Sequence, residues 1–489
     1  MKYISTRKGI ETLSSAQAIK KGIADNGGLF VPDHIPLLTD SLFDRLVDMD
    51  YAERAAEILS LFLTDYDKNA LKEDCRRAYG EGAFTGGAAP TVKLGEGKYL
   101  LELFHGPTCA FKDMALQIMP RLLSRALKMT KEKKTAYILV ATSGDTGKAA
   151  LEGYRDVEGV KIKVFYPVNG VSAIQKLQMS TQEGRNVSVQ AINGNFDDAQ
   201  NGVKRIFSDK ELNARLRAAG YTLTSANSIN WGRLAPQIVY YISSYIDLYT
   251  AGEIKRGEKI AFCVPTGNFG NIFAGYLAYR MGLPVSRFIC ASNKNNILTD
   301  FINTGVYDRN REFYQTMSPS MDILISSNLE RLLYFVSGRE KTAEYMNRLA
   351  ETGRYEISKE ELAEIQSIFE GGFTDEEGTA AEIKATYKET CAVIDPHTAV
   401  AYRQAEQYAY RTGGKVVTVS TASPYKFAAD VLKSLGKKAD NKRGVLSPLY
   451  ELSEYTGTPI PAPLASLEGK SVRFTGAVNA ADMPDTLFD

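Results

Sequence analysis

Between residues 91 and 290, short apolar runs alternate with longer segments whose apolar residues recur at helical spacing. The short runs predict strands, and the longer segments predict helices between them. Because strands that alternate with helices of this length usually pair in parallel, the pattern predicts an α/β fold with mostly parallel sheet. The predicted strands cover residues 99–103, 137–141, 160–167, 187–192, 259–264 and 287–291, and the predicted helices cover residues 147–154, 172–183, 197–208, 231–249 and 270–281.

The pattern changes on both sides of this region. Residues 1–90 carry helical spacing and predict a mainly helical N-terminal region, which ends at a glycine-rich boundary before Pro90. Residues 91–435 form the predicted core, with a smaller subdomain at about 130–220 and a helix-dominated insertion at about 300–410. A strand at 415–420 and a helix at 426–435 complete that core. We expect the proline-rich tail, residues 436–489, to wrap the surface.

Composition and charge narrow the range of functions. The chain has 489 residues, 44% of them hydrophobic and 24% charged, which suits an ordinary globular protein with large cores. Its net charge of +1 gives no reason to expect nucleic acid or a membrane surface as a partner. No apolar run approaches the ~20 residues that span a bilayer, and the N-terminus lacks a signal-peptide core. The scattered cysteines and histidines predict a cytoplasmic protein without a metal site.

A lysine is the first candidate for chemistry. Residues 104–117 read F-H-G-P-T-C-A-F-K-D-M-A-L-Q, which places Lys112 where a loop meets a packed helix. An amine at such a junction can be desolvated, which lowers its pKa and makes it a nucleophile or Schiff-base partner. The alternative is a surface lysine at a helix end. We expect His105 to be structural rather than catalytic, and Asp113 to cap the loop.

Two glycine-containing loops each follow a predicted strand and open a predicted helix. Residues 142–147 read T-S-G-D-T-G, and residues 265–271 read P-T-G-N-F-G-N. Hydroxyls and free backbone N–H groups at a helix start suit a carboxylate or a phosphate. Neither loop is a P-loop, because G-K-[ST] is missing. An ordinary turn that caps a helix is the alternative for each loop.

Two further polar stretches suit an anionic or polar ligand. Residues 225–233 read S-A-N-S-I-N-W-G-R, with Asn227 and Ser228 as short polar donors and Arg233 as a fork that matches an oxyanion. Residues 418–424 end a predicted strand with hydroxyls, including that of Thr421, at the edge where ligands of α/β sheets gather. The alternatives are a helix cap and an ordinary strand end.

Together these stretches resemble the threonine synthases, pyridoxal-phosphate (PLP) enzymes of the tryptophan-synthase-β fold type. The motifs F-H-G-P-T-x-A-F-K-D, T-S-G-D-T-G, S-A-N-S-I-N-x-x-R and G-N-F-G-N are similar to that family's, as are the N-terminal S-T-R-K-G and G-I-A-D-N-G-G-L-F-V-P. The resemblance covers residues 3 to about 436. There are two departures: T-A-S-P-Y-K-F stands where many members read T-A-H-P-A-K-F, and Asp145 stands where related PLP enzymes have asparagine.

The resemblance implies PLP-dependent fold type II, with two open, mostly parallel sheets flanked by helices, and residues 91–435 as the PLP-binding catalytic core. It implies that Lys112 carries the cofactor covalently, that the loop at 267–271 binds its phosphate, and that the Thr421 hydroxyl meets the pyridine nitrogen. The cofactor-binding residues implied are Lys112, Phe111, Gly267, Asn268, Phe269, Gly270, Asn271 and Thr421.

The substrate implied by the resemblance is O-phospho-L-homoserine. In the implied reaction, the enzyme converts this substrate and water to L-threonine and phosphate. The resemblance also implies that Lys112 would take the α-proton and later move the β-protons as a general acid and base. It further implies that Thr142, Ser143 and the N–H groups behind them receive the α-carboxylate, and that Asn227, Ser228 and Arg233, with Thr146, hold the phosphate. The substrate-binding residues implied are Thr142, Ser143, Asp145, Thr146, Asn227, Ser228 and Arg233.

Other interpretations stay open. A phospholyase would use the same cofactor but release 2-oxobutyrate and ammonia instead of adding water. A non-catalytic relative that binds a phosphometabolite is disfavoured by the presence of Lys112, and a nucleotide-binding protein is disfavoured by the missing P-loop lysine. We expect a monomer or weak homodimer that acts on a small molecule, with no nucleic acid and no membrane as partners.

Overall fold

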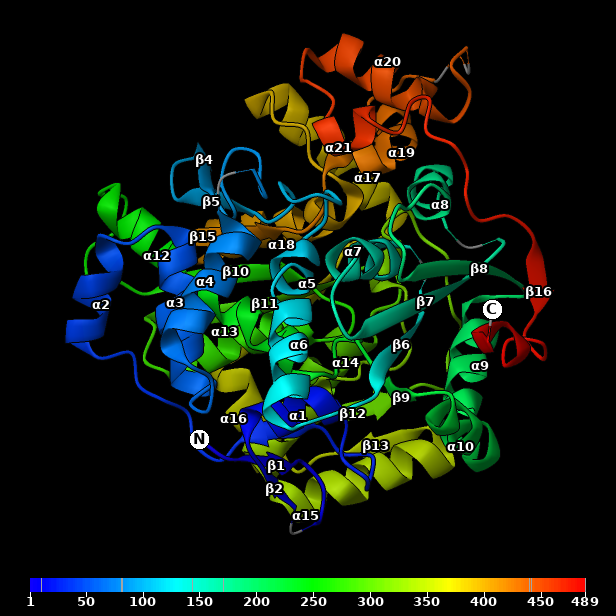
Figure 1. Cartoon of the computed structure of the whole chain (residues 1–489). Coiled ribbons are helices and arrows are strands. Elements are labelled where there is room, and N and C mark those ends of the chain that lie inside the picture. The colour runs from blue at the N-terminus through cyan, green and yellow to red at the C-terminus, as the bar shows by residue number, and fades with distance from the viewer. Residues whose placement is uncertain are drawn as a thin grey trace.

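The computed structural model describes residues 1–9, 11–80, 82–142, 144–169, 171–438, 440 and 442–488. Two sheets lie beside each other and are flanked by helices (Figure 1). This arrangement confirms the predicted α/β fold with two mostly parallel sheets. The division of the chain at residues 90, 130, 220, 300, 410 and 435 stays a prediction.

The N-terminal region is mainly helical, as predicted, and begins with a small antiparallel sheet. Its helices start at side-chain caps: Ser14 accepts a hydrogen bond from the Gln17 amide, and Asp50 accepts one from the Glu53 amide. Their apolar faces join the main core. The elements are β1 (Tyr3–Ser5), β2 (Thr12–Leu13), α1 (Ser15–Lys21), β3 (Phe30–Pro32), α2 (Asp40–Val47), α3 (Tyr51–Phe62) and α4 (Lys68–Tyr79).

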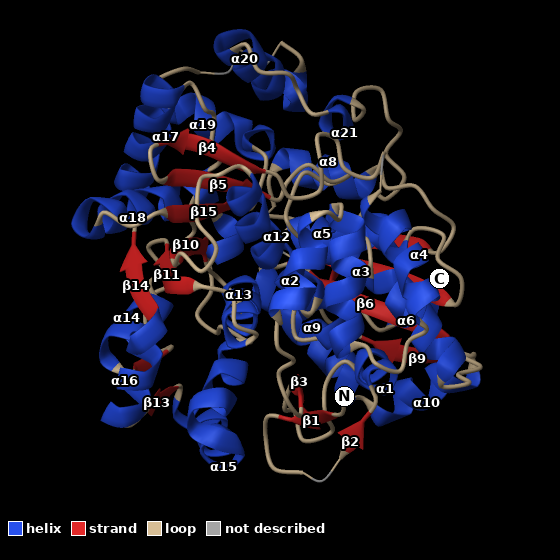
Figure 2. Ribbon diagram, turned by 90° about the vertical axis from the view of Figure 1, so that its left-hand side faces the viewer, coloured by secondary structure: helices blue, strands red, loops and turns tan. Residues whose placement is uncertain are grey.

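The larger sheet contains β4 (Thr91–Gly95), β5 (Lys98–Glu102), β10 (Ile260–Pro265), β11 (Val285–Ser292), β14 (Phe369–Phe373) and β15 (Val416–Ser420). The strands follow the order β14-β11-β10-β15-β5-β4, which Figure 2 shows from bottom to top. All neighbours pair in parallel except β4 with β5. Because β5, β10 and β15 are parallel, the loops after them meet at one edge of the sheet.

The smaller sheet contains β6 (Thr135–Ala141), β7 (Val160–Pro167), β8 (Val187–Asn193), β9 (Tyr221–Thr224) and β16 (Ala477–Asn479). Its order is β16-β8-β7-β6-β9, and all pairs are parallel. The helices that follow its strands are α7 (Asp145–Tyr154), α8 (Ala173–Ser180), α9 (Phe196–Ser208) and α10 (Lys210–Ala218).

Helices between and around the sheets carry the site loops. They are α5 (Asp113–Leu116), α6 (Met119–Met129), α11 (Trp231–Leu234), α12 (Pro236–Thr250) and α13 (Gly270–Arg280). The prediction of one helix over residues 231–249 was wrong, because Pro236 lacks a backbone N–H and starts a new helix at its first position.

The segment at 300–410 is rich in helix but also supplies β14, which the prediction missed. Two glycines, Gly371 and Gly372, lie in β14 and hide its strand pattern. They let helices pack closely, because a Cβ at Gly371 would lie 3.0 Å from the Thr299 Cα atom. The other elements are α14 (Ile297–Thr304), β12 (Val306–Asp308), η1 (Pro319–Met321), α15 (Leu329–Thr352), β13 (Arg354–Glu356), α16 (Lys359–Ile368), α17 (Glu376–Thr390) and α18 (Pro396–Thr412).

The C-terminal part runs over the outside of the molecule and then adds β16 to the smaller sheet, beside β8 (Figure 1). The predicted helix at 426–435 is shorter, because a 3-10 turn that begins at Pro424 precedes it. The sequence did not predict β16, because a strand of three residues is too short to show an alternating hydrophobic pattern. The elements are η2 (Pro424–Phe427), α19 (Ala428–Ser434), η3 (Gly444–Leu446), α20 (Ser447–Thr456), α21 (Ala462–Ala465) and η4 (Asp485–Phe488).

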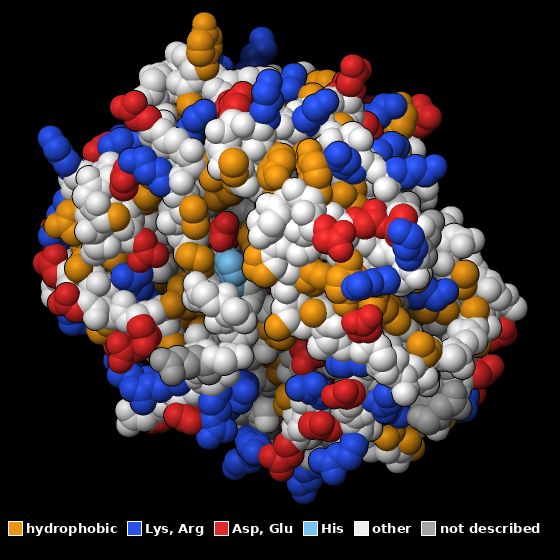
Figure 3. Space-filling model, turned by 90° about the horizontal axis from the view of Figure 1, so that it is seen from above, with side chains coloured by type: hydrophobic (Ala, Val, Ile, Leu, Met, Phe, Trp, Pro, Cys, Tyr) orange, Lys and Arg blue, Asp and Glu red, His pale blue; other side chains and the backbone are white. Residues whose placement is uncertain are grey.

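The surface carries both signs of charge. In the view from above, Lys and Arg side chains are interspersed with Asp and Glu (Figure 3). A small net charge of +1 over the whole chain agrees with this mixture. Within the described ranges, no helix has the length and apolar character needed to cross a membrane.

Candidate active site

Lys112 lies directly before α5, in the loop that follows β5. This loop rests on the loop that follows β15: the Phe111 amide donates to the Thr421 carbonyl at 2.8 Å, and Ala110 bridges to Ala422. Lys112 is only 8% exposed, and its Nζ atom lies 4.8 Å from the centre of the Phe111 ring. The parallel pairing of β5 with β15 therefore brings Lys112, Phe111 and Thr421 together.

The Lys112 amine has two polar neighbours from distant segments. Its Nζ atom lies 3.5 Å from Oδ2 of Asp145 and 3.3 Å from Oγ of Ser320. Burial lowers the pKa of Lys112 to about 8; the charge of Asp145 opposes this shift, and the charges of Arg233 and Lys426 add to it. The amine can therefore lose its proton near neutral pH, as a nucleophile and a proton carrier both require.

The loop at 265–271 opens α13 with unused backbone donors. Its carbonyls are tied down: Ser326 Oγ donates to the Gly267 carbonyl at 2.7 Å, and Asn328 Nδ2 donates to the Asn268 carbonyl at 3.0 Å. In the described part of the chain, the N–H groups of residues 267–272 donate to no protein acceptor. These donors lie at the positive end of a helix, which is a ready site for a phosphate.

The loop at 142–147 uses part of its polar capacity internally. Thr142 Oγ1 accepts hydrogen bonds from the amides of Gly144 and Gly147, at 3.0 and 2.9 Å. Asp145 lies at the start of α7 and is buried, with Oδ1 accepting from Gln175 Nε2 at 2.8 Å. Ser143 lies outside the described residues. The assignment of this loop to the substrate stays a prediction.

Arg233 is a buried guanidinium beside this loop. Its Nη1 donates to the Ala226 carbonyl at 3.0 Å, and its Nη2 lies 3.5 Å from Thr146 Oγ1. Burial lowers the pKa of Arg233 to about 10, and no described carboxylate forms an ion pair with it. A buried cation without an acid partner is costly, so this position favours an anionic ligand.

The predicted stretches form a closed ring of contacts. Lys112 contacts Asp145, whose neighbour Thr146 contacts Arg233. Ser228, in the same stretch as Arg233, accepts from Asn328 Nδ2 at 3.3 Å, and Asn328 also contacts Asn268. The ring closes through Ser320, because a Cβ at Gly267 would lie 2.6 Å from the Ser320 carbonyl oxygen. Ser320 in turn contacts Lys112.

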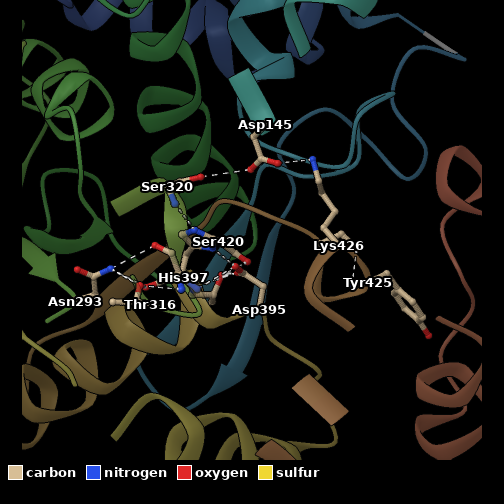
Figure 4. Close-up of polar contacts among 12 residues, drawn as sticks. Asp145, Asn293, Thr316, Ser320, Asp395, His397, Ser420, Tyr425 and Lys426 are labelled. Atoms are coloured by element: carbon tan, nitrogen blue, oxygen red, sulfur yellow. Dashed lines mark hydrogen bonds and ion pairs between the residues drawn. The ribbon is translucent and has the colours of Figure 1, made fainter. Parts of the chain in front are cut away.

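Several residues of this ring carry no local signal in the sequence. Ser320 lies in η1, and its amide donates to His397 Nε2 at 3.1 Å, while His397 Nδ1 lies 2.6 Å from Asp395 Oδ2 (Figure 4). Arg331 is fully buried and donates to the Ile229 carbonyl at 2.6 Å, which fixes the stretch before Arg233. The other residues missed are Gln175, Ser326, Asn328 and Lys426; of these only Lys426 fell within a quoted motif.

Two polar residues near Lys112 in sequence, Asp113 and His105, have structural partners. Asp113 accepts from the Thr108 amide at 2.8 Å and from the Thr108 hydroxyl at 2.7 Å, which confirms that it caps the loop. His105 Nε2 lies 2.7 Å from Glu102 Oε2, and its ring stacks on Phe104. A structural role for His105 stays a prediction.

Residues 2–79 match the family model described as the threonine synthase N terminus, residues 88–422 match the model of pyridoxal-phosphate dependent enzymes, and residues 398–484 match the model of the threonine synthase C-terminal region. The chain belongs to the threonine synthase family of PLP-dependent enzymes.

Individual relatives support the same family assignment. The threonine synthase of Pseudomonas aeruginosa is 39% identical over 471 residues, which cover 96% of this chain and 97% of that protein. The human threonine synthase-like 1 protein is 40% identical over 482 residues, and this chain spans only 64% of its length.

Solved structures of this family have the same fold. The PLP-bound threonine synthase from Brucella melitensis superposes with a TM-score of 0.88 at 35% identity, covering 99% of this chain and 98% of that one. The yeast threonine synthase gives a TM-score of 0.89 at 32% identity, covering 100% and 98%.

The residues present fit the cofactor of this family, which is PLP. Lys112 supplies a buried amine whose pKa is lowered to about 8, and the donors at residues 267–272 suit a phosphate. The Thr421 hydroxyl makes no hydrogen bond to another described residue, so it can serve a ring nitrogen. The assignment of each residue to a part of the cofactor is a proposal.

Proposed function

We propose that this protein is a threonine synthase, which converts O-phospho-L-homoserine and water to L-threonine and phosphate. The observation that carries this proposal is Arg233: its guanidinium is buried beside Thr146 and has no described carboxylate partner. A phosphate ester bound there would supply the missing negative charge, and a guanidinium matches its oxygens bidentately.

The proposed binding mode divides the ring between cofactor and substrate. Lys112 carries the cofactor, with Phe111, the loop at 267–271 and Thr421 around it. Asn227, Ser228, Arg233 and Thr146 hold the substrate phosphate. The substrate α-carboxylate meets the loop at 142–147; because Thr142 Oγ1 already accepts two backbone hydrogen bonds, the loop amides are the stronger candidates there. The N–H groups of Asp145 and Thr146 meet no protein acceptor in the described structure.

When bound, PLP supplies an electron sink for negative charge on the substrate carbons. The Lys112 amine takes the proton from the α-carbon and then moves protons between the β- and γ-carbons. Arg233 stabilises the phosphate as its bond to the γ-carbon breaks. Water then adds at the β-carbon, and Lys112 returns the α-proton. Asp145 and Ser320 orient the amine through these steps.

We propose a cytoplasmic protein that acts as a monomer or weak homodimer on a small-molecule substrate. The chain spans 64% of the length of the threonine synthase-like 1 proteins of human and Pongo abelii. The reaction therefore has to be established on this protein itself.

The test is a product assay on the purified full chain. With O-phospho-L-homoserine, we expect L-threonine and phosphate in equal amounts and no 2-oxobutyrate. Release of 2-oxobutyrate and ammonia would identify a phospholyase instead, and no turnover would overturn both. Arg348→Met is the matched control for substitution of Arg233, because Arg348 is an exposed arginine on α15 that pairs with Glu344. This variant should behave as the unchanged protein does.

A further inference from the structure

One carboxylate in the site serves two lysines. Lys426 Nζ lies 2.6 Å from Asp145 Oδ1, whereas Lys112 Nζ lies 3.5 Å from Asp145 Oδ2 (Figure 4 shows the Lys426 contact). Both partners of the shorter pair are buried, with side-chain exposures of 0% for Lys426 and 2% for Asp145. The shorter contact is a close ion pair between buried groups, and the longer one is a hydrogen bond at the upper limit of length.

The contacts of Lys426 come from separate parts of the fold. Lys426 itself lies in η2, after the last strand of the larger sheet, and Asp145 starts the first helix of the smaller one. Lys426 also donates to the Thr108 carbonyl at 3.0 Å, in the loop that carries Lys112. Gln175 occupies the same oxygen of Asp145 as Lys426. Oδ1 is therefore fully used, and only Oδ2 faces Lys112 and Ser320.

We propose that Lys426 is a positioning residue: it engages Asp145 so that this carboxylate orients the Lys112 amine without holding it in the protonated form. The proposal rests on the proposed role of Lys112 as the cofactor-bearing amine. It does not depend on which product the enzyme releases. It assigns a function to a buried lysine that touches neither the reacting amine nor the loop at 267–271 in the described contacts.

The charges around Lys112 set the direction of the expected effect. Asp145 on α7 favours the ammonium form, whereas Arg233 on α11 and Lys426 on η2 disfavour it; Ser320 on η1 is neutral. Burial alone would raise the pKa of Asp145, but Lys426 and then Lys112 lower it well below its usual value. Without Lys426, an ionised Asp145 has Lys112 as its remaining cation, so the pKa of Lys112 should rise.

A second reading is that Lys426 only clamps the loops together. The two readings differ in what a second substitution does. If Lys426 acts by balancing the charge of Asp145, Asp145→Asn should reverse the effect of Lys426→Met on the amine. If Lys426 only holds the loops together, Asp145→Asn should not reverse the effect of Lys426→Met on the Lys112 amine, and the double variant should be no more stable than Lys426→Met.

The experiment measures the Lys112 amine directly in the full chain freed of cofactor. The rate at which acetic anhydride acetylates Lys112 is followed against pH by peptide mass spectrometry, because only the free amine reacts. The unchanged protein should give a midpoint near its pKa of about 8. Lys426→Met should move the midpoint up by about one unit, which slows labelling at pH 7 about tenfold. Lys426→Arg should keep it near the original value.

Matched variants make each outcome decisive. Asp145→Asn should move the midpoint down, and Asp145→Asn/Lys426→Met should return it towards that of the unchanged protein. Lys148→Met is the control: Lys148 is a buried lysine on the same helix, paired with Glu152 at 3.0 Å, and its loss should not move the midpoint. An unmoved midpoint in Lys426→Met, or no reversal in the double variant, overturns the proposal. If Lys426→Met fails to fold, an unmoved midpoint in Asp145→Asn overturns it.

Discussion

Arg233 is the residue whose removal tests the substrate site most sharply. Arg233 is only 5% exposed, and its partners among the described residues are a carbonyl and a hydroxyl rather than an acid. In the proposed complex, the substrate phosphate provides the negative charge. Arg233→Met keeps most of the side-chain volume and removes the charge and the donors.

The size of the effect follows from the kind of interaction. Hydrogen bonds to charged groups are worth about 1.5–3 kcal/mol, which corresponds to a loss of roughly 10- to 150-fold in kcat/KM. Arg233→Lys should recover only part of this loss, because a point charge cannot replace a planar fork. Folding should suffer less than activity, since losing the Ala226 carbonyl contact is offset by no longer burying an unpaired cation.

The assay combines kinetics with thermal unfolding in inorganic phosphate. Phosphate should stabilise the unchanged protein, by about 2.7 kcal/mol at 100 times its Kd, and stabilise Arg233→Met much less. The cofactor absorbance should be the same in both. Unchanged kcat/KM would refute the assignment of Arg233 to the substrate phosphate, and loss of the cofactor spectrum would move Arg233 to the cofactor site or the core.

The remaining predictions concern the lysine and the two glycine-containing loops. Borohydride reduction followed by peptide mapping should find the cofactor on Lys112, and label on another lysine would refute that assignment. The pKa of Lys112 is about 8 in the folded protein against 10.5 for an ordinary lysine. Burial of the charged amine therefore lowers the free energy of unfolding by its full amount below pH 8, and by less as the pH rises towards 10.5. Without cofactor, the unchanged protein should therefore gain stability over this range relative to Lys112→Met, by at most about 3 kcal/mol in chemical unfolding; an equal pH dependence of both would contradict the shift. Gly267→Val should lose the cofactor on dialysis, because its Cβ would lie 2.6 Å from the Ser320 carbonyl, whereas Ser143→Ala should keep the cofactor and raise KM or lower kcat. The opposite result would reverse the roles of the two loops.

The parts of the site that the sequence predicted are those with a local signature. Lys112 stands in a distinctive loop between a strand and a helix, and the loops at 142–147 and 265–271 each combine glycines with a helix start. Such features depend on neighbouring residues alone. The alternation of strands and helices likewise predicted most of both sheets, because each βα unit is local in sequence.

The parts that it missed depend on contacts between distant segments. Ser320 and Asn328 close the ring around the site, but they lie in an irregular stretch, and nothing nearby in sequence marks them as site residues. Strand β14 was hidden because Gly371 and Gly372, which have low strand propensity, lie where α14 and α18 approach closely: a Cβ would contact Thr299 at the first and Gln404 at the second. Lys426 was visible in a motif, yet its pairing with Asp145 requires both sheets to be in place.

The proposed reaction adds water to the substrate after its phosphate has been eliminated. The most direct test is the reaction of the purified protein with O-phospho-L-homoserine in water labelled with oxygen-18. We expect L-threonine to carry the label in its hydroxyl group and the released phosphate to carry none, because the bond between the γ-carbon and its oxygen breaks. Label in the phosphate would show attack at phosphorus instead, and 2-oxobutyrate in place of threonine would contradict the addition of water at the β-carbon.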